Sequence, residues 1–256
     1  VLVGSSSSNS GSLTNVQALL AELNTNLFIV SIVFYLFSIV VWLISWAYLI
    51  KKRVVVPYSK LVAIGMTCLY GALTPVQVGA EALRSLRAKE FFGISYTDSV
   101  SAALVAKGSK FLILGMVAFL SLLFFLNTQS DPVFFFGFLS GLIVVLLVCT
   151  LFLFPLEKHA AATLSRSLER LSEPLPFFSR VGRFFACYSE RLNELRAEEF
   201  FIMLFLAALS WAFEFFALQY AFFALGIVLS FHSLLLLMVM ISVLERAPFL
   251  PRGIGL

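Results

Sequence analysis

Charged residues are scarce in this chain: only 12% of its 256 residues are Asp, Glu, Lys or Arg, whereas a typical soluble domain carries about 25%. Cysteine and histidine are rarer still, with three Cys and two His. Neither an HExxH nor a CxxC pattern occurs, so the sequence predicts no metal site and no cofactor. We interpret Cys68, Cys149 and Cys187, which lie far apart, as reduced packing residues.

Apolar side chains are abundant instead. They make up 61% of the chain, and 29 residues are Phe. One soluble core cannot bury so many, which excludes a soluble enzyme, a disordered tail and a nucleic-acid-binding module. The net charge of +4 fits basic residues at the cytoplasmic ends of membrane helices. We therefore predict an all-α, polytopic integral membrane protein of the plasma membrane.

The clearest membrane span covers residues 27–50, which include no charged residue. At about 1.5 Å per residue this segment is long enough to cross a bilayer. Lys51, Lys52 and Arg53 follow directly, so the positive-inside rule places this end in the cytoplasm. Further spans are expected at 111–127, 133–155 and 200–227, and a surface amphipathic helix at 13–24.

Two apolar segments are interrupted by Pro and Gly. Residues 61–80 lie between basic flanks, so a complete crossing would leave one basic flank outside the cell. A re-entrant loop avoids this conflict, and broken backbone at membrane depth requires a protein interior or a wet cavity around it. Residues 229–256 are interrupted in the same way, by Pro248, Pro251, Gly253 and Gly255.

The two interrupted segments suggest an inverted repeat. Pro75 to Gly79 and Pro251 to Gly255 share a Pro-x-x-x-Gly pattern. Each pattern follows one long span, and the two spans are predicted to run in opposite directions. Paired interruptions of this kind indicate a binding site in the middle of the membrane. We expect one domain over 1–256, with a first repeat at 27–155, a linker at 156–198 and a truncated second repeat at 200–256.

The polar segments are expected on the cytoplasmic side. These are residues 51–60, a polar helix at 81–110, and the linker at 156–198. A stripe of apolar residues in the linker recurs every three or four positions and predicts a helix lying on the inner membrane surface. The stripe consists of Phe177, Val181, Phe184, Tyr188, Leu192 and Leu195.

Charged residues near the interruptions and inside the spans are the candidate site residues. Glu214 has apolar neighbours on both sides, and a carboxylate at the bilayer centre costs several kcal/mol unless it is paired or wet. It is interpreted as a cavity-facing functional carboxylate, as the partner of an Arg, or as a residue nearer the membrane surface. Glu245 and Arg246 are adjacent, which leaves open a pair that neutralises itself.

The basic residues are candidates for phosphate binding. Arg252 has no acidic sequence neighbour, and an arginine binds phosphate through a planar fork of N–H groups. Arg84, Arg87, Lys107 and Lys110 are either solvated cations at the membrane surface or the rim of a cavity that attracts phosphate.

The stretch from Leu73 to Arg84, followed by Phe92 to Ser95, resembles the flippase-like transmembrane domain of lysylphosphatidylglycerol synthases. That family shows a Pro-x-x-x-Gly-Glu-x-x-Arg-like pattern and a Gly-Ile-Ser-like turn. It also has a later Pro-Gly-Gly-Ile-Gly-like motif, to which Pro251 to Gly255 is similar. Two departures are visible. Glu81 lies one residue past the expected place, and Lys107 and Lys110 replace an Arg and an Asp.

The resemblance implies that the chain moves a charged lipid between leaflets. The lipid class stays open among phospholipids, aminoacyl-phospholipids and polyprenyl-phosphate sugars. Two alternatives remain: a secondary transporter of a small anionic solute, and a non-transporting membrane partner of a lipid-modifying complex. An intramembrane enzyme is least favoured, because no Ser/His or paired-Asp constellation occurs.

The expected partners are lipids with anionic headgroups, in a possible homo-oligomer and without nucleic acid. The predicted binding and translocation residues are Pro75, Gly79, Glu81, Arg84, Arg87, Lys107, Lys110, Glu214, Glu245, Arg246, Pro251, Arg252, Gly253 and Gly255.

Overall fold

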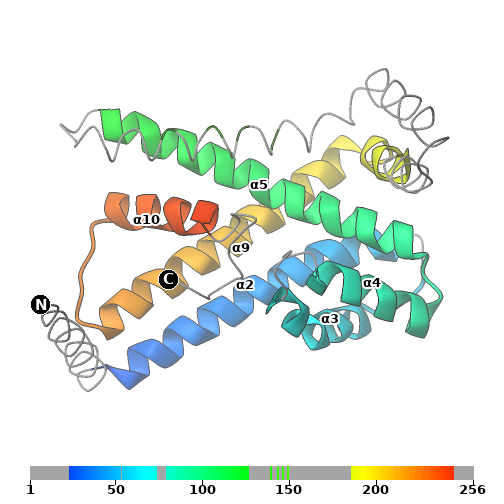
Figure 1. Cartoon of the computed structure of the whole chain (residues 1–256), viewed down its shortest axis with the longest axis horizontal. Coiled ribbons are helices and arrows are strands. Elements are labelled where there is room, and N and C mark those ends of the chain that lie inside the picture. The colour runs from blue at the N-terminus through cyan, green and yellow to red at the C-terminus, as the bar shows by residue number, and fades with distance from the viewer. Residues whose placement is uncertain are drawn as a thin grey trace, which may run out of the picture.

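The computed structural model is all helical in the residues that it describes, which are 23–52, 54–73, 79–126, 139, 143, 146, 149 and 186–244. Three helices are long and apolar enough to cross a membrane. They are α2 (Thr25–Lys51), α5 (Tyr96–Leu126) and α9 (Ala197–Ala224). The shorter elements are α3 (Tyr58–Thr67), the 3-10 helix η1 (Leu69–Leu73), α4 (Gly79–Phe92) and α10 (Phe231–Leu244) (Figure 1). The predicted all-α membrane fold is confirmed.

Helices α2 and α9 form an antiparallel pair at the centre of the molecule (Figure 1). Small polar side chains on α2 let the two backbones approach closely. Hydrogen-bonded contacts recur every seven residues along the pair: Asn24 N to Ala224 O (2.9 Å), Ser31 Oγ to Ala217 O (2.7 Å), and Ser38 Oγ with Ser210 Oγ (3.0 Å). The spans predicted at 27–50 and 200–227 therefore exist and run in opposite directions.

The interruption predicted in residues 61–80 is present. Helix α3 ends at Thr67, η1 covers the next residues, and α4 begins at Gly79. Gly71 lies directly against the start of α4. A Cβ atom at this position would come within 2.7 Å of the Gly79 carbonyl carbon and 2.8 Å of the Ala80 nitrogen. Only glycine therefore fits where η1 meets α4.

We expect Gly71→Ala to destabilise the protein by about 1–3 kcal/mol, the range for overpacking a close contact. The measurement is the thermal unfolding midpoint in detergent. Gly93→Asn is the matched control, because Gly93 has φ +67° with nothing within 4 Å of a Cβ, and Asn tolerates this conformation. An Ala variant at Gly71 as stable as wild type would contradict the close packing of η1 and α4.

The single polar helix predicted at 81–110 is wrong. Helix α4 ends at Phe92, Gly93 adopts a left-handed conformation, and α5 begins at Tyr96. Ser95 Oγ accepts a hydrogen bond from the Asp98 backbone N–H (3.3 Å), which caps the new helix. The span predicted at 111–127 is thus the second half of α5. Lys107 and Lys110 consequently lie within a candidate span, Tyr96–Ser121.

The described part of the linker packs on protein. Residues 186–193 are helical, and Tyr188 and Leu192 are buried against residues of α2 and α5. Arg191 Nη2 donates to Asp98 Oδ1 (3.2 Å), which holds this segment to the start of α5. The predicted helix is therefore present at these residues, and two residues of its apolar stripe pack on the protein; its position on the membrane surface stays a prediction.

Several predicted segments fall outside the described residues. These are 13–22, most of 133–155, the linker up to residue 185, and 245–256. The described positions Leu139, Ile143, Leu146 and Cys149 are helical, as expected for the span at 133–155.

The two short helices that follow the central spans lie at opposite ends of the α2–α9 pair (Figure 1). Gly65 of α3 packs against Leu43, in the second half of α2. Met238 of α10 lines a pocket together with Ser31, in the first half of α2. Helix α3 therefore packs near one end of the α2–α9 pair, and α10 packs near the other end.

Candidate functional site

Two ion pairs lie one helical turn apart on α5. Lys107 Nζ is 3.0 Å from Glu81 Oε1 of α4, and Lys110 Nζ contacts Glu214 Oε1 of α9. Residues three apart share one face of a helix, so both lysines point toward the helices that pack on α5. Each lysine thus defines a charged centre within the helical bundle.

The first centre is built around Arg84 and is called the Arg84 centre; it comprises Trp42, Trp46, Glu81, Arg84 and Lys107. The Arg84 side chain is only 2% exposed. Its guanidinium carbon lies 4.8 Å from the Trp42 ring centroid and 4.6 Å from that of Trp46. The two tryptophans are four residues apart on α2, so both rings stand on one face and contact the cation.

Several buried polar atoms of the Arg84 centre make no hydrogen bond in the described part of the chain. Nε and Nη2 of Arg84 are buried and have no hydrogen-bond partner in the described part of the chain, and the same holds for Trp42 Nε1 and Glu81 Oε2. An unmade hydrogen bond at a buried charged group costs more than about 1–3 kcal/mol. The centre therefore offers three buried N–H donor atoms without an acceptor.

Arg84 keeps its positive charge despite burial. Desolvation lowers the pKa of Arg84 to about 10, and the nearby Glu81 carboxylate and Cys68 thiol oppose this shift. A pKa of about 10 leaves the guanidinium protonated at neutral pH. The structure consequently holds a buried cation with two guanidinium nitrogens that make no hydrogen bond in the described part of the chain.

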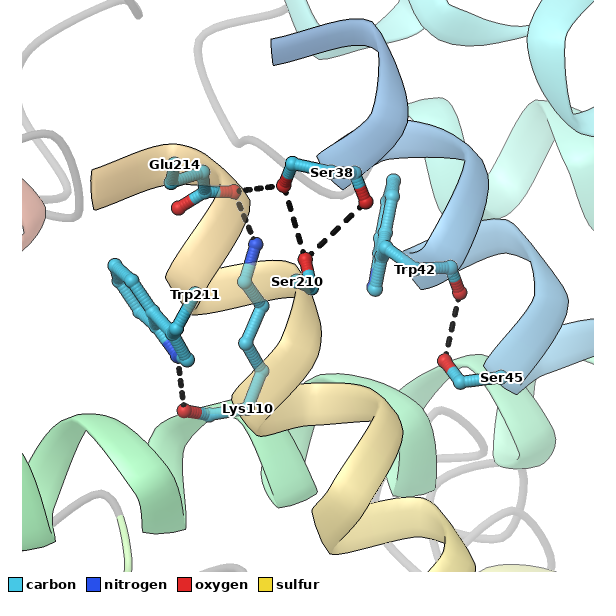
Figure 2. A network of polar contacts seen from close by, with 7 residues as sticks. All are labelled: Ser38, Trp42, Ser45, Lys110, Ser210, Trp211 and Glu214. Atoms are coloured by element: carbon cyan, nitrogen blue, oxygen red, sulfur yellow. Dashed lines mark hydrogen bonds and ion pairs between the residues drawn. The ribbon is translucent and has the colours of Figure 1, made fainter. Parts of the chain in front are cut away.

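The second centre, called the Glu214 centre, joins all three long helices (Figure 2). Glu214 Oε1 accepts hydrogen bonds from Lys110 Nζ and from Ser38 Oγ (2.8 Å). Ser210 Oγ lies 3.0 Å from Ser38 Oγ. Trp211 Nε1 donates to the Lys110 carbonyl oxygen (2.8 Å), and the Lys110 ammonium lies 5.0 Å from the centre of the Trp211 ring. Glu214 is thus paired with a lysine rather than with an arginine.

A pocket of about 250 Å³ lies between α2, α9 and α10 and reaches Glu214. Most of its wall is apolar, and Glu214 is the one charged residue among those that line it. The side chain of Glu214 is 23% exposed. The lining residues are Ser31, Tyr35, Trp211, Glu214, Ala217, Leu218, Ala221, Met238, Ile241 and Ser242.

The predicted site residues divide into three groups. Glu81, Arg84 and Lys107 meet in the Arg84 centre, with Gly79 at the start of the same helix, and Lys110 and Glu214 meet in the Glu214 centre. Arg87 joins neither, because it forms an exposed pair with Glu90 at 2.9 Å. The remaining predicted residues lie outside the described part of the chain: Pro75, Glu245, Arg246, Pro251, Arg252, Gly253 and Gly255.

Sequence reasoning missed the α2 residues that complete both centres. None of Trp42, Trp46 and Ser38 was among the predicted site residues. Two spacings in the sequence of α2 indicate these residues. The four-residue spacing of the tryptophans places both rings on one face. The seven-residue spacing of Ser31, Ser38 and Ser45 marks the buried face of α2.

A comparison with protein families matches residues 9–256 to the lysylphosphatidylglycerol synthase TM region. Comparisons with curated proteins and with solved structures gave no significant match. The family match covers essentially the whole chain and agrees with the resemblance of the motifs around Gly79. Together with the three candidate spans, it makes this a membrane protein linked to lipid handling. The chain belongs to the family of the lysylphosphatidylglycerol synthase TM region.

Proposed function

We propose that the chain is a lipid flippase or scramblase that moves a phosphate-bearing lipid between leaflets. The observation that carries this proposal is the state of Arg84, a protonated guanidinium that is 2% exposed. Two of its buried nitrogen atoms have no hydrogen-bond partner among the residues that the structure describes. A buried charge requires a counter-charge or hydrogen bonds to be tolerated. A lipid phosphate supplies both.

The chemistry of the Arg84 centre favours phosphate over other ligands. The planar guanidinium presents parallel N–H groups that match two phosphate oxygens. The rings of Trp42 and Trp46 contact its faces, so that the N–H edge remains for a ligand. The unpartnered indole N–H of Trp42 adds a third donor. The carboxylate of Glu81 is already paired with Lys107 and leaves Arg84 to the ligand.

Polar groups continue along α2 from the Arg84 centre. Trp46 and Trp42 are followed by Ser38 of the Glu214 centre and then by Ser31 of the pocket. The rise of about 1.5 Å per residue separates Trp46 from Ser31 by about 22 Å, most of a hydrocarbon core of about 30 Å. We infer that the headgroup follows these groups while the lipid tails remain in the bilayer.

We further propose the topology that this path requires. The short helices α3 and α10 belong to re-entrant segments of an inverted repeat, which approach the α2–α9 pair from opposite sides of the plasma membrane. Residues 51–60 and the linker lie in the cytoplasm by the positive-inside rule. The part of 81–110 within α5 belongs to a span. The placement of α3 and α10 at opposite ends of the pair (Figure 1) supports this topology.

The test is lipid translocation in vesicles that contain the purified protein. The probes are a fluorescent phosphatidylglycerol and an uncharged fluorescent glycosyl-diacylglycerol with the same chains, each followed by quenching from outside. We expect the protein to expose inner-leaflet phosphatidylglycerol to the quencher and to leave the glycolipid at its protein-free rate. Equal rates for both probes would overturn phosphate recognition.

A second arm of this experiment separates lipid from solute transport. The same vesicles are assayed for uptake of radiolabelled inorganic phosphate. We expect no uptake above protein-free vesicles. Phosphate uptake without lipid movement would contradict the proposal and would favour a secondary transporter of a small anion.

A further inference from the structure

We propose that the Lys110–Glu214 pair couples lipid movement to a proton, so that one proton binds Glu214 when an anionic headgroup replaces this carboxylate as the partner of Lys110. This inference rests on the proposed function and adds a driving force to it. The proton forms an O–H bond with Glu214 and comes from the aqueous phase on one side of the membrane; it is released to the aqueous phase on the other side when the ion pair with Lys110 forms again. Lys110 stays protonated throughout.

The position of the pair suits this role. Lys110 lies near the middle of α5 and Glu214 near the middle of α9, and their side chains are 14% and 23% exposed. Ser38 of α2 binds the same carboxylate oxygen at 2.8 Å. One carboxylate therefore holds three membrane helices together, and its loss of charge changes the contacts of all three.

The two oxygens of Glu214 have different surroundings. Oε1 accepts both hydrogen bonds of the Glu214 centre. Oε2 has no hydrogen-bond partner among the described residues (Figure 2). Glu214 also lines the pocket. The mostly apolar lining of the pocket also includes the hydroxyl groups of Ser31, Tyr35 and Ser242, and polar groups in a cavity of this size can bind water. A proton thus has a route to this carboxylate.

The charged and titratable groups around Glu214 come from defined elements. Helix α5 contributes Lys110, and α2 contributes Tyr35 to the pocket. The lining residues from α10 are Met238, Ile241 and Ser242, none of which titrates in the physiological range. Glu214 is therefore the carboxylate among the residues that line the pocket, and we assign the proton to it.

Charge balance links the proton to the headgroup. Protonation of Glu214 alone would remove one negative charge from beside Lys110 inside the membrane, which is costly. A phosphate monoanion on Lys110 replaces the charge that is lost. By linkage, the proton and the anion each strengthen binding of the other. One proton then accompanies each negative charge carried by the lipid.

The Arg84 centre lies next to the Lys110–Glu214 pair along α5. Lys107, which holds Glu81, is one turn from Lys110 on the same face of α5. The rise along α5 between these lysines is about 4.5 Å. A phosphate that leaves Arg84 and moves along α5 therefore next meets Lys110. Cationic groups at such spacing limit the desolvation free energy of the phosphate as it moves from one to the next.

The experiment measures where labelled phosphatidylglycerol accumulates in vesicles with a pH gradient. With one proton per lipid, a gradient of about one pH unit shifts the ratio between leaflets about tenfold, toward the leaflet that faces the higher pH. We expect this shift with wild type and no shift in protein-free vesicles. A trapped pH-sensitive dye should report proton movement in the same direction.

Two variants assign the coupling to Glu214. We expect Glu214→Gln to translocate lipid more slowly and to give the same leaflet ratio with and without the gradient. Glu90→Gln, at an exposed carboxylate in a surface pair with Arg87, should keep the wild-type response. Wild-type translocation that ignores the gradient would overturn the coupling and leave the flippase proposal standing. The absence of any phospholipid translocation would overturn both.

Discussion

Replacing Arg84 by Met should slow phospholipid translocation about 100-fold or more. Each hydrogen bond to a charged group contributes about 1.5–3 kcal/mol, and two guanidinium nitrogens have no partner in the described ranges of the chain. The thermal midpoint should stay unchanged or rise. A buried ion replaced by an apolar side chain of similar volume often leaves stability equal or higher, and Met can fill the space beside Trp42 and Trp46. Translocation and unfolding are measured on the same preparation.

Arg87→Met is the matched control for this experiment. Arg87 lies one turn farther along α4, and its side chain is 47% exposed in its pair with Glu90. We expect its translocation rate to remain within about twofold of wild type, because exposed ion pairs contribute about 0–1 kcal/mol. A variant at Arg84 that is as active as the one at Arg87 would contradict the phosphate role. A large loss of stability at Arg84 would identify a structural cation instead.

Replacing Lys110 by Met should destabilise the protein by about 3 kcal/mol, the lower end of the cost of leaving one partner of a buried ion pair uncompensated. Only Ser38 would then contact the charged oxygen of Glu214. Glu214→Gln should also destabilise the protein, because it leaves the Lys110 ammonium without this counter-charge, although the neutral amide oxygen can still accept from Ser38. Thermal unfolding in detergent measures both effects.

The double variant Lys110→Met with Glu214→Gln tests whether the loss of the ion pair causes the loss of stability in Lys110→Met. Residues in direct contact show non-additive effects, and removing both charges removes the uncompensated one. We expect the double variant to regain most of the stability lost in Lys110→Met. If the two losses simply add, the lysine acts through its packing on Trp211 and not through Glu214.

Local patterns in the sequence were sufficient to predict the long helices. Residues 27–50 and 200–227 are apolar over more than the thickness of a bilayer, and the structure places α2 and α9 there. The prediction of one polar helix over 81–110 missed the break between α4 and α5, although the family resemblance implied a Gly-Ile-Ser-like turn at Gly93 to Ser95. The left-handed conformation of Gly93 and the cap at Ser95 end one helix and begin the next.

The two centres could be predicted only in part. The apolar neighbours of Glu214 indicate that a carboxylate there needs a partner or water, and the structure provides Lys110 and the pocket. The partner itself comes from a helix about a hundred residues away in the chain, and no local spacing identifies such a contact. For the same reason, Lys107 and Lys110 resemble solvated cations in the sequence although each faces a carboxylate of another helix.

The most direct test of phosphate recognition is a density map of the full chain in a nanodisc that contains phosphatidylglycerol, at a resolution that shows lipid headgroups. The account predicts a phosphate group within hydrogen-bond distance of Arg84 Nε or Nη2, at the edge left open beside Trp42 and Trp46. Nitrogen atoms of Arg84 that are fully bonded to protein groups or to water, with no lipid headgroup near them, would contradict it.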